Sequence, residues 1–196
     1  MSEPEKPSSA CAGPFETMGR RSFLRTTLSL LLYGFSGRAA RAMDSVWTTY
    51  QTPESFVAQA FGGATPPVKL LDLDANLQAQ IGSVFGHAYP QSRLHYWRAN
   101  GRSVWILDDV GKEGYQPTTA GFAVQNGAIV WARVLVYRES RGEQVAQPSF
   151  LNQLNGARLN GAQLDRSVTN ISGATLSVLM MQRMARLALK LDALAP

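Results

Sequence analysis

The chain has 196 residues, with 19 Lys and Arg against 14 Asp and Glu, a formal net charge of +5. Six of the basic and three of the acidic residues lie within residues 1–42, so the remainder has a net charge near +2 and no Lys/Arg run indicating nucleic-acid binding. The one cysteine, Cys11, also lies there, which excludes disulfides, iron–sulfur clusters, thiolate zinc sites and c-type haem attachment from residues 43–196.

Residues 1–42 have the layout of an export signal. Arg20-Arg21 precede an apolar stretch at residues 26–37, and Ala40-Arg41-Ala42 follows as a cleavage site. The pattern resembles a twin-arginine signal, which implies recognition by the twin-arginine translocase and export of the folded protein to a bacterial periplasm. The apolar stretch is shorter than the ~20 residues that span a bilayer. We therefore expect cleavage near Met43 and a product that is soluble or peripherally associated with the inner membrane.

Residues 43–196 are expected to form a single domain that begins with short elements. Thr52-Pro53 predicts the start of a helix that runs to Phe61, and a short strand follows at residues 68–73. Asp74 is then expected to cap a second helix, which ends at Gly86. His87 and His95 lack the spacing of metal ligands, and no metal site is predicted.

Two Asn-Gly pairs dominate the middle of the chain. Residues 94–99 and 102–107 flank the first pair, and residues 121–125 and 128–137 flank the second, with many β-branched and aromatic residues. This pattern predicts two β-hairpins in an antiparallel sheet and an α+β fold, with helices packed on the sheet. No Gly-x-Gly-x-x-Gly loop is present, which disfavours a nicotinamide dehydrogenase.

The last helix is expected from Leu176 to about residue 191, lying across the sheet. Its apolar positions recur every three or four residues: Leu179, Met180, Met184, Leu187 and Leu191. Methionines at this spacing usually fill a core, so Met180, Met181 and Met184 receive no functional role. The basic residues Arg183, Arg186 and Lys190 are expected on the solvated face.

Ser172-Gly173-Ala174-Thr175 stands where a polar loop becomes this helix. A helix start offers unpaired N–H groups and the positive end of the dipole, so a phosphate esterified to Thr175 would be stabilised there. The alternative interpretation is that Ser172 or Thr175 merely caps the helix, a common role for these residue types.

The C-terminal half, roughly residues 95–192, resembles the FMN-binding domain family, known from periplasmic subunits of sodium-pumping NADH:quinone reductases and Rnf-type electron-transport complexes. The family motif reads roughly Asp-x-x-Ser/Thr-Gly-Ala-Thr, and the sequence matches its end at Ser172, Gly173, Ala174 and Thr175. Glu139 and Gly142 match a family Glu-x-x-Gly, and residues 150–156 resemble Phe-x-x-Gln-Phe-x-Gly. The family's aspartate is replaced here by Thr169.

The resemblance implies that Thr175 takes FMN through a phosphoester made by a flavin transferase, and that Glu139 lies near the flavin. The expected function is an exported flavoprotein that carries electrons between a membrane-bound reductase and an extracytoplasmic acceptor, without a catalytic triad. The hairpin aromatics are candidate ring contacts but more often serve packing: Trp97, Trp105, Trp131 and Tyr137. Two alternatives remain open: a flavin-dependent reductase with its own small substrate, and a non-flavinylated scaffold or binding module of the same fold.

Overall fold

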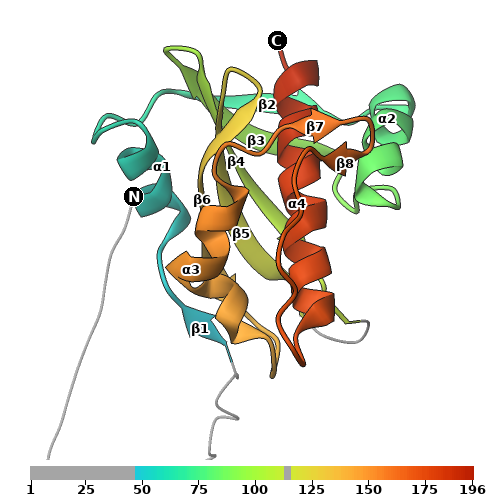
Figure 1. Ribbon diagram of the computed structural model, residues 1–196. Coiled ribbons are helices and arrows are strands. Elements are labelled where there is room, and N and C mark those ends of the chain that lie inside the picture. The colour runs from blue at the N-terminus through green and yellow to red at the C-terminus, as the bar shows by residue number, and fades with distance from the viewer. Residues whose placement is uncertain (1–46, 113–115) are drawn as a thin grey trace, which may run out of the picture. The chain divides into compact units, whose positions relative to one another are not determined.

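The computed structural model describes residues 47–112 and 116–196, all of which belong to residues 42–196, the second of two units into which the chain divides. The fold is α+β: a six-stranded antiparallel sheet carries a long C-terminal helix, α4, and shorter helices (Figure 1). The strand order in this sheet is β1-β6-β5-β4-β3-β2, and β7 pairs with β8 in a separate ribbon. The elements in chain order are β1 (Thr48–Thr49), α1 (Pro53–Ala60), β2 (Val68–Asp72), α2 (Ala75–Phe85), β3 (Arg93–Ala99), β4 (Arg102–Asp109), β5 (Thr118–Gln125), β6 (Ala128–Tyr137), η1 (Glu143–Ala146), α3 (Pro148–Leu151), η2 (Asn152–Leu154), β7 (Leu159–Asn160), β8 (Gln163–Leu164) and α4 (Thr175–Leu194).

The two N-terminal helices begin at the residues that the sequence predicts. The Thr52 side chain caps α1 by accepting a hydrogen bond from the N–H of Ser55. The Asp74 carboxylate caps α2 by accepting from the N–H of Leu77 at 2.8 Å. Gly86 ends α2 in the left-handed conformation, with φ of 100°.

The central strands are joined by tight turns. Asn100-Gly101 connects β3 to β4 and Asn126-Gly127 connects β5 to β6, and all four residues have positive φ. The sheet extends beyond these four strands, because β2 pairs with β3 and β1 pairs with β6. The sequence predicts β2 but not β1, whose two residues are too few to leave a hydrophobic pattern.

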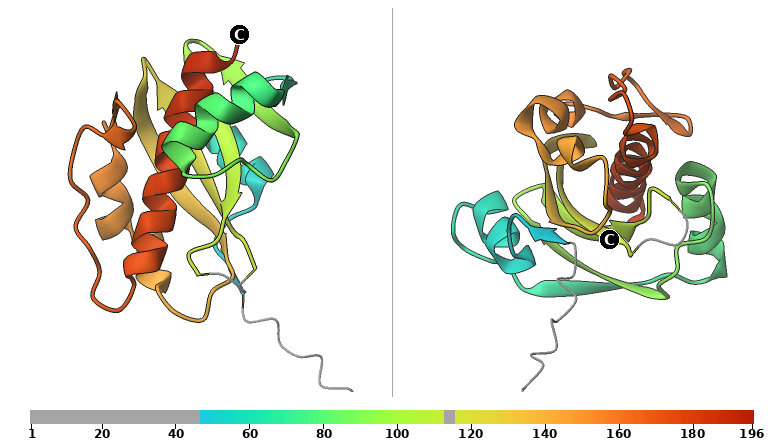
Figure 2. Two further views of the ribbon diagram at one scale, coloured as in Figure 1. Left: turned by 90° about the vertical axis from the view of Figure 1, so that its right-hand side faces the viewer. Right: turned by 90° about the horizontal axis from the view of Figure 1, so that it is seen from below.

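Each face of the sheet carries its own apolar cluster. The larger one lies under α4 and α2 and includes Trp105, Phe122 and Met184. The smaller one includes Phe56 of α1. Figure 2 shows α1 and α4 on opposite faces of the sheet. Gly121 in β5 makes this second cluster possible, because a Cβ there would lie 2.5 Å from the Phe56 ring.

Helix α4 buries its methionines, as predicted, since Met180, Met181 and Met184 have no exposed surface. The expectation that Leu179 belongs to the same buried face is wrong, because its side chain is 44% exposed. The buried stripe passes from Ser177 through the methionines, which turns Leu179 outward together with Leu176.

The prediction of a solvated basic face on α4 is also wrong for two arginines. Arg183 forms an ion pair with Asp109 at the end of β4, with 2.8 Å between the closest atoms. Arg186 donates to the carbonyl oxygen of Val84 in α2 at 2.9 Å. These contacts tie α4 to the sheet and to α2, and helical periodicity alone does not reveal such partners from distant segments.

Candidate functional site

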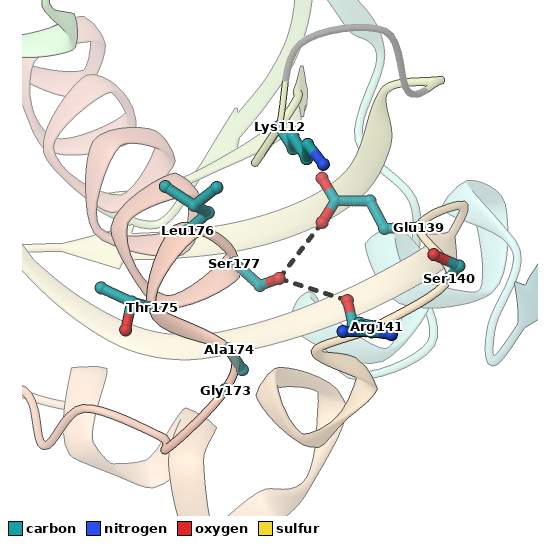
Figure 3. Close-up of a pocket in the computed structure, with 9 residues that line it drawn as sticks. All are labelled: Lys112, Glu139, Ser140, Arg141, Gly173, Ala174, Thr175, Leu176 and Ser177. Carbon is teal, nitrogen blue, oxygen red and sulfur yellow. Dashed lines mark hydrogen bonds between the residues drawn. The ribbon is translucent and has the colours of Figure 1, made fainter.

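A cavity of about 580 Å³ lies at the start of α4, beside the end of β6 and the segment after β4 (Figure 3). This volume is within the range of small-ligand sites. Its lining brings together Thr175 and Glu139, which are far apart in the sequence, as well as residues that the sequence did not single out. The lining residues are Lys112, Glu139, Ser140, Arg141, Gly173, Ala174, Thr175, Leu176 and Ser177. Ser172 is not one of them.

Thr175 is the first residue of α4 and is exposed. The N-cap position is held by Ala174, and among the described residues no side chain caps this helix, so neither Ser172 nor Thr175 serves as the cap. The N–H groups of a first helical turn have no partner within the helix, and the helix dipole adds positive potential there. The helix start is thus available to an anion beside the Thr175 hydroxyl.

The loop before α4 is held by its own hydrogen bonds. Asn170 Nδ2 donates to Thr175 Oγ1 at 2.9 Å. Thr169, which stands where the family has aspartate, donates its N–H to Gln153 Oε1 at 2.8 Å. Gly173 has φ of 79°, within a turn closed by the N–H of Ala174. The loop is therefore ordered without a carboxylate at position 169.

Glu139 is buried at the wall of the cavity, with 7% of its surface exposed. One carboxylate oxygen accepts from the N–H of Gly111 at 2.5 Å, and the other accepts from the Ser177 hydroxyl at 3.1 Å. These bonds join the segment after β4, the end of β6 and the first turn of α4. Glu139 therefore has a positioning role in the wall, whatever the cavity binds.

Tyr137 and Gly142 complete this network behind the cavity. The Tyr137 hydroxyl donates to the carbonyl oxygen of Arg141 and lies 3.1 Å from the Ser177 hydroxyl. Burial raises the pKa of Tyr137 from 10.0 to about 12. Gly142 has φ of 91°, and a Cβ there would lie 2.8 Å from the Tyr137 hydroxyl. The glycine thus allows the 139–142 segment to pass close to α4.

The electrostatic surroundings of the cavity are mixed. Lys112 and Arg141 contribute cationic side chains that are exposed at its lining. Asp109, at the end of β4 and outside the lining, is buried and paired with Arg183, which also donates to the carbonyl oxygen of Val110 at 2.7 Å. Burial raises the pKa of the Asp109 carboxyl above its ordinary value, although the Arg183 guanidinium acts in the opposite direction.

The aromatic residues considered as ring contacts all serve packing. Trp105 stacks on Tyr96 with ring centroids 4.8 Å apart, and Trp131 stacks on Phe56 at 4.5 Å. Trp97 packs against the smaller cluster, and Tyr137 belongs to the larger one. None of these rings lines the cavity. Apolar surface near Thr175 comes instead from Leu176 and Leu179, which are 48% and 44% exposed.

These residues fit an FMN phosphoester on physical grounds. The exposed Thr175 hydroxyl provides an ester oxygen, and the uncapped helix start and Arg141 favour the phosphate charge. Leu176 and Leu179 offer exposed apolar surface for a planar ring on successive turns of α4. The chain itself would supply binding, orientation and electrostatics.

Residues Arg20 and Arg21 of the expected export signal lie outside the described residues. Within residues 47–112 and 116–196, no helix is long and apolar enough to cross a membrane, and no three His, Cys, Asp or Glu side chains group to hold a metal ion. Comparison with known proteins found no matching family model, curated protein or solved structure.

Proposed function

We propose that this chain is an exported electron-carrying flavoprotein of the FMN-binding domain type, with FMN esterified to Thr175. The observation that carries the proposal is the exposed Thr175 hydroxyl at the uncapped start of α4, on the lining of a cavity of about 580 Å³. A hydroxyl, a helix N-terminus and a cavity in one place are what attachment of a phosphorylated ligand requires.

Each matched residue has a separate role in this proposal. Gly173 allows the tight turn before α4 through its positive φ, and the buried side chain of Ala174 packs the start of the helix against the domain. Glu139 shapes the cavity wall through its bonds to Gly111 and Ser177. Ser172, which lies outside the cavity lining, belongs to the surface that a flavin transferase reads.

Bound FMN would supply reversible electron transfer, and the protein would supply its orientation and the tuning of its potential. An ester bond suits a carrier outside the cytoplasm, because a released cofactor would be lost there. The partners implied are a membrane-bound electron donor or acceptor and the twin-arginine translocase. The paired strands β3–β4 and β5–β6 would form the framework of the domain, with β1 and β2 added at its edges.

The test is to express the full chain with a flavin transferase, purify it from the periplasm and measure its intact mass. We expect a polypeptide beginning near Met43 with an added mass of one FMN less one water. Thr175→Ala should lose that addition and keep its fold, because the hydroxyl is exposed. Thr175→Ser should retain it, and Ser92→Ala is the matched control, because it removes an exposed hydroxyl outside the cavity lining.

Other outcomes distinguish the alternatives. A yellow protein with a bare polypeptide mass would favour a flavin-dependent reductase that holds its cofactor without a covalent bond. A colourless protein with a bare mass, despite a transferase active on another substrate, would favour a scaffold or binding module. Flavin retained in Thr175→Ala would contradict attachment at this residue, and protein confined to the cytoplasm would contradict export.

A further inference from the structure

The Thr175 hydroxyl has a specific neighbour in the loop before α4. Asn170 Nδ2 donates a hydrogen bond to Thr175 Oγ1 at 2.9 Å, although both residues are exposed to solvent. A threonine side chain in the first turn of a helix otherwise has more than one accessible rotamer. The bond selects the rotamer in which the oxygen faces the loop.

Asn170 is itself fixed from both sides. The preceding residue, Thr169, donates its N–H to Gln153 Oε1 at 2.8 Å, which attaches the loop to η2. The following residue, Ile171, accepts the N–H of Ala174 at 2.9 Å, which attaches it to the start of α4. The donor to Thr175 is therefore presented by an anchored loop.

We propose that Asn170 orients the Thr175 hydroxyl for phosphoryl transfer, an inference that rests on Thr175 being the flavin acceptor. Ester formation from free FMN would release water and is unfavourable in water, so the donor class is a flavin dinucleotide. Thr175 Oγ1 forms a bond to the flavin-side phosphorus while the pyrophosphate P–O bond breaks. The nucleoside monophosphate leaves with the bonding electrons, and the hydroxyl proton passes to a base of the transferase.

The direction of the hydrogen bond suits this step. A hydroxyl has one proton and two lone pairs, so accepting from Asn170 occupies one lone pair. The proton stays available to the base, and the second lone pair stays available to phosphorus. A carboxylate at position 170 would instead accept a hydrogen bond from the Thr175 hydroxyl, which would occupy its proton. Asn170 is thus a positioning residue, and its contribution is the pre-orientation that accelerates transfer between bound groups.

The experiment incubates the full chain with a flavin transferase and a flavin dinucleotide and follows flavin loading by intact mass. The concentration of this chain, the protein substrate of the transferase, is varied. For Asn170→Ala we expect kcat to fall roughly tenfold, the scale of one lost hydrogen bond, with KM for the acceptor protein and the melting temperature unchanged. Asn170→Asp has the same size but lacks the amide donor, so it should also load slowly. Asn170→Gln keeps the amide on an exposed side chain and should recover part of the rate.

Asn76→Ala is the matched control, because Asn76 is an exposed asparagine on α2. If the wild-type chain and Asn170→Ala are both loaded and with the same kcat, the role of Asn170 is overturned and the proposed function stands. A change confined to KM would overturn it too, since that indicates recognition by the transferase. No loading of the wild-type chain would overturn both proposals. Should Asn170→Ala fail to fold, the isosteric Asn170→Asp provides the same comparison.

Discussion

Replacing Gly142 with alanine should lower the free energy of unfolding by about 2–5 kcal/mol, from two separable causes. Gly142 has φ of 91°, and an L-residue in the left-handed region costs roughly 1–2 kcal/mol. A Cβ there would also lie 2.8 Å from both the Ser177 Cβ and the Tyr137 hydroxyl. Overpacking at a filled site costs roughly 1–3 kcal/mol more.

A second glycine separates these two causes. Gly86 has φ of 100°, yet a Cβ added there would meet no atom within 4 Å. Gly86→Ala should therefore show the backbone cost alone, about 1–2 kcal/mol. The difference between the two variants measures how closely the 139–142 segment approaches α4 at the cavity wall.

Urea denaturation followed by circular dichroism gives both values, provided that the slope of free energy against urea concentration is the same in each variant. We expect Gly142→Ala to unfold at a clearly lower urea concentration than Gly86→Ala. Equal midpoints would refute the reasoning, because they would mean that the Tyr137 and Ser177 side chains move aside without cost and that the network behind the cavity is not tightly packed.

Two further predictions concern buried ionisable groups. Burial raises the pKa of Tyr137 from 10.0 to about 12, so the folded state keeps this proton where the unfolded chain loses it. Stability should be unaffected by this group below pH 10 and fall as the pH rises towards 12, by at most about 1.4 kcal/mol per pH unit. Tyr137→Phe should remove this decrease of the free energy of unfolding with pH, as measured by denaturation curves between pH 10 and 12. An unchanged decrease would mean that another group causes it. Arg183→Ala leaves the Asp109 carboxylate, whose side chain is 3% exposed, without its partner and should cost about 3 kcal/mol at neutral pH. The double variant that also carries Asp109→Asn should recover part of that loss. If Arg183→Ala alone is as stable as the wild type, the ion pair contributes nothing to stability.

Elements with short-range signals were predictable from the sequence. Thr52 and Asp74 are N-caps as expected, and the Asn-Gly pairs stand at the turns of β3–β4 and β5–β6. Thr175 was recognised through a four-residue motif at the start of α4. Such features depend on residues a few positions apart, so their physical cause lies within the stretch of sequence that is read.

The cavity wall shows where such prediction ends. Glu139 was expected near the cofactor from its motif, but its bonds to Gly111 and Ser177 were not foreseen. Likewise, Arg183 was assigned to solvent, because periodicity places it on the polar side of α4 and cannot reveal Asp109 at the end of β4. Thr169 lacks the carboxylate of the resembled motif, as the sequence shows, but the sequence does not reveal that its backbone N–H donates to Gln153.

The amino-acid sequence by itself determined the caps, the tight turns, the buried methionine stripe of α4 and the Ser172–Thr175 motif at the start of that helix. The tertiary structure alone decided that Thr175 and Glu139 line one cavity, that Leu176 and Leu179 are exposed near it, and that Asn170 donates a hydrogen bond to the Thr175 hydroxyl. The reason is physical: local conformation follows from steric and hydrogen-bonding preferences of adjacent residues, whereas the rotation of α4 and the register of the strands depend on packing between distant segments.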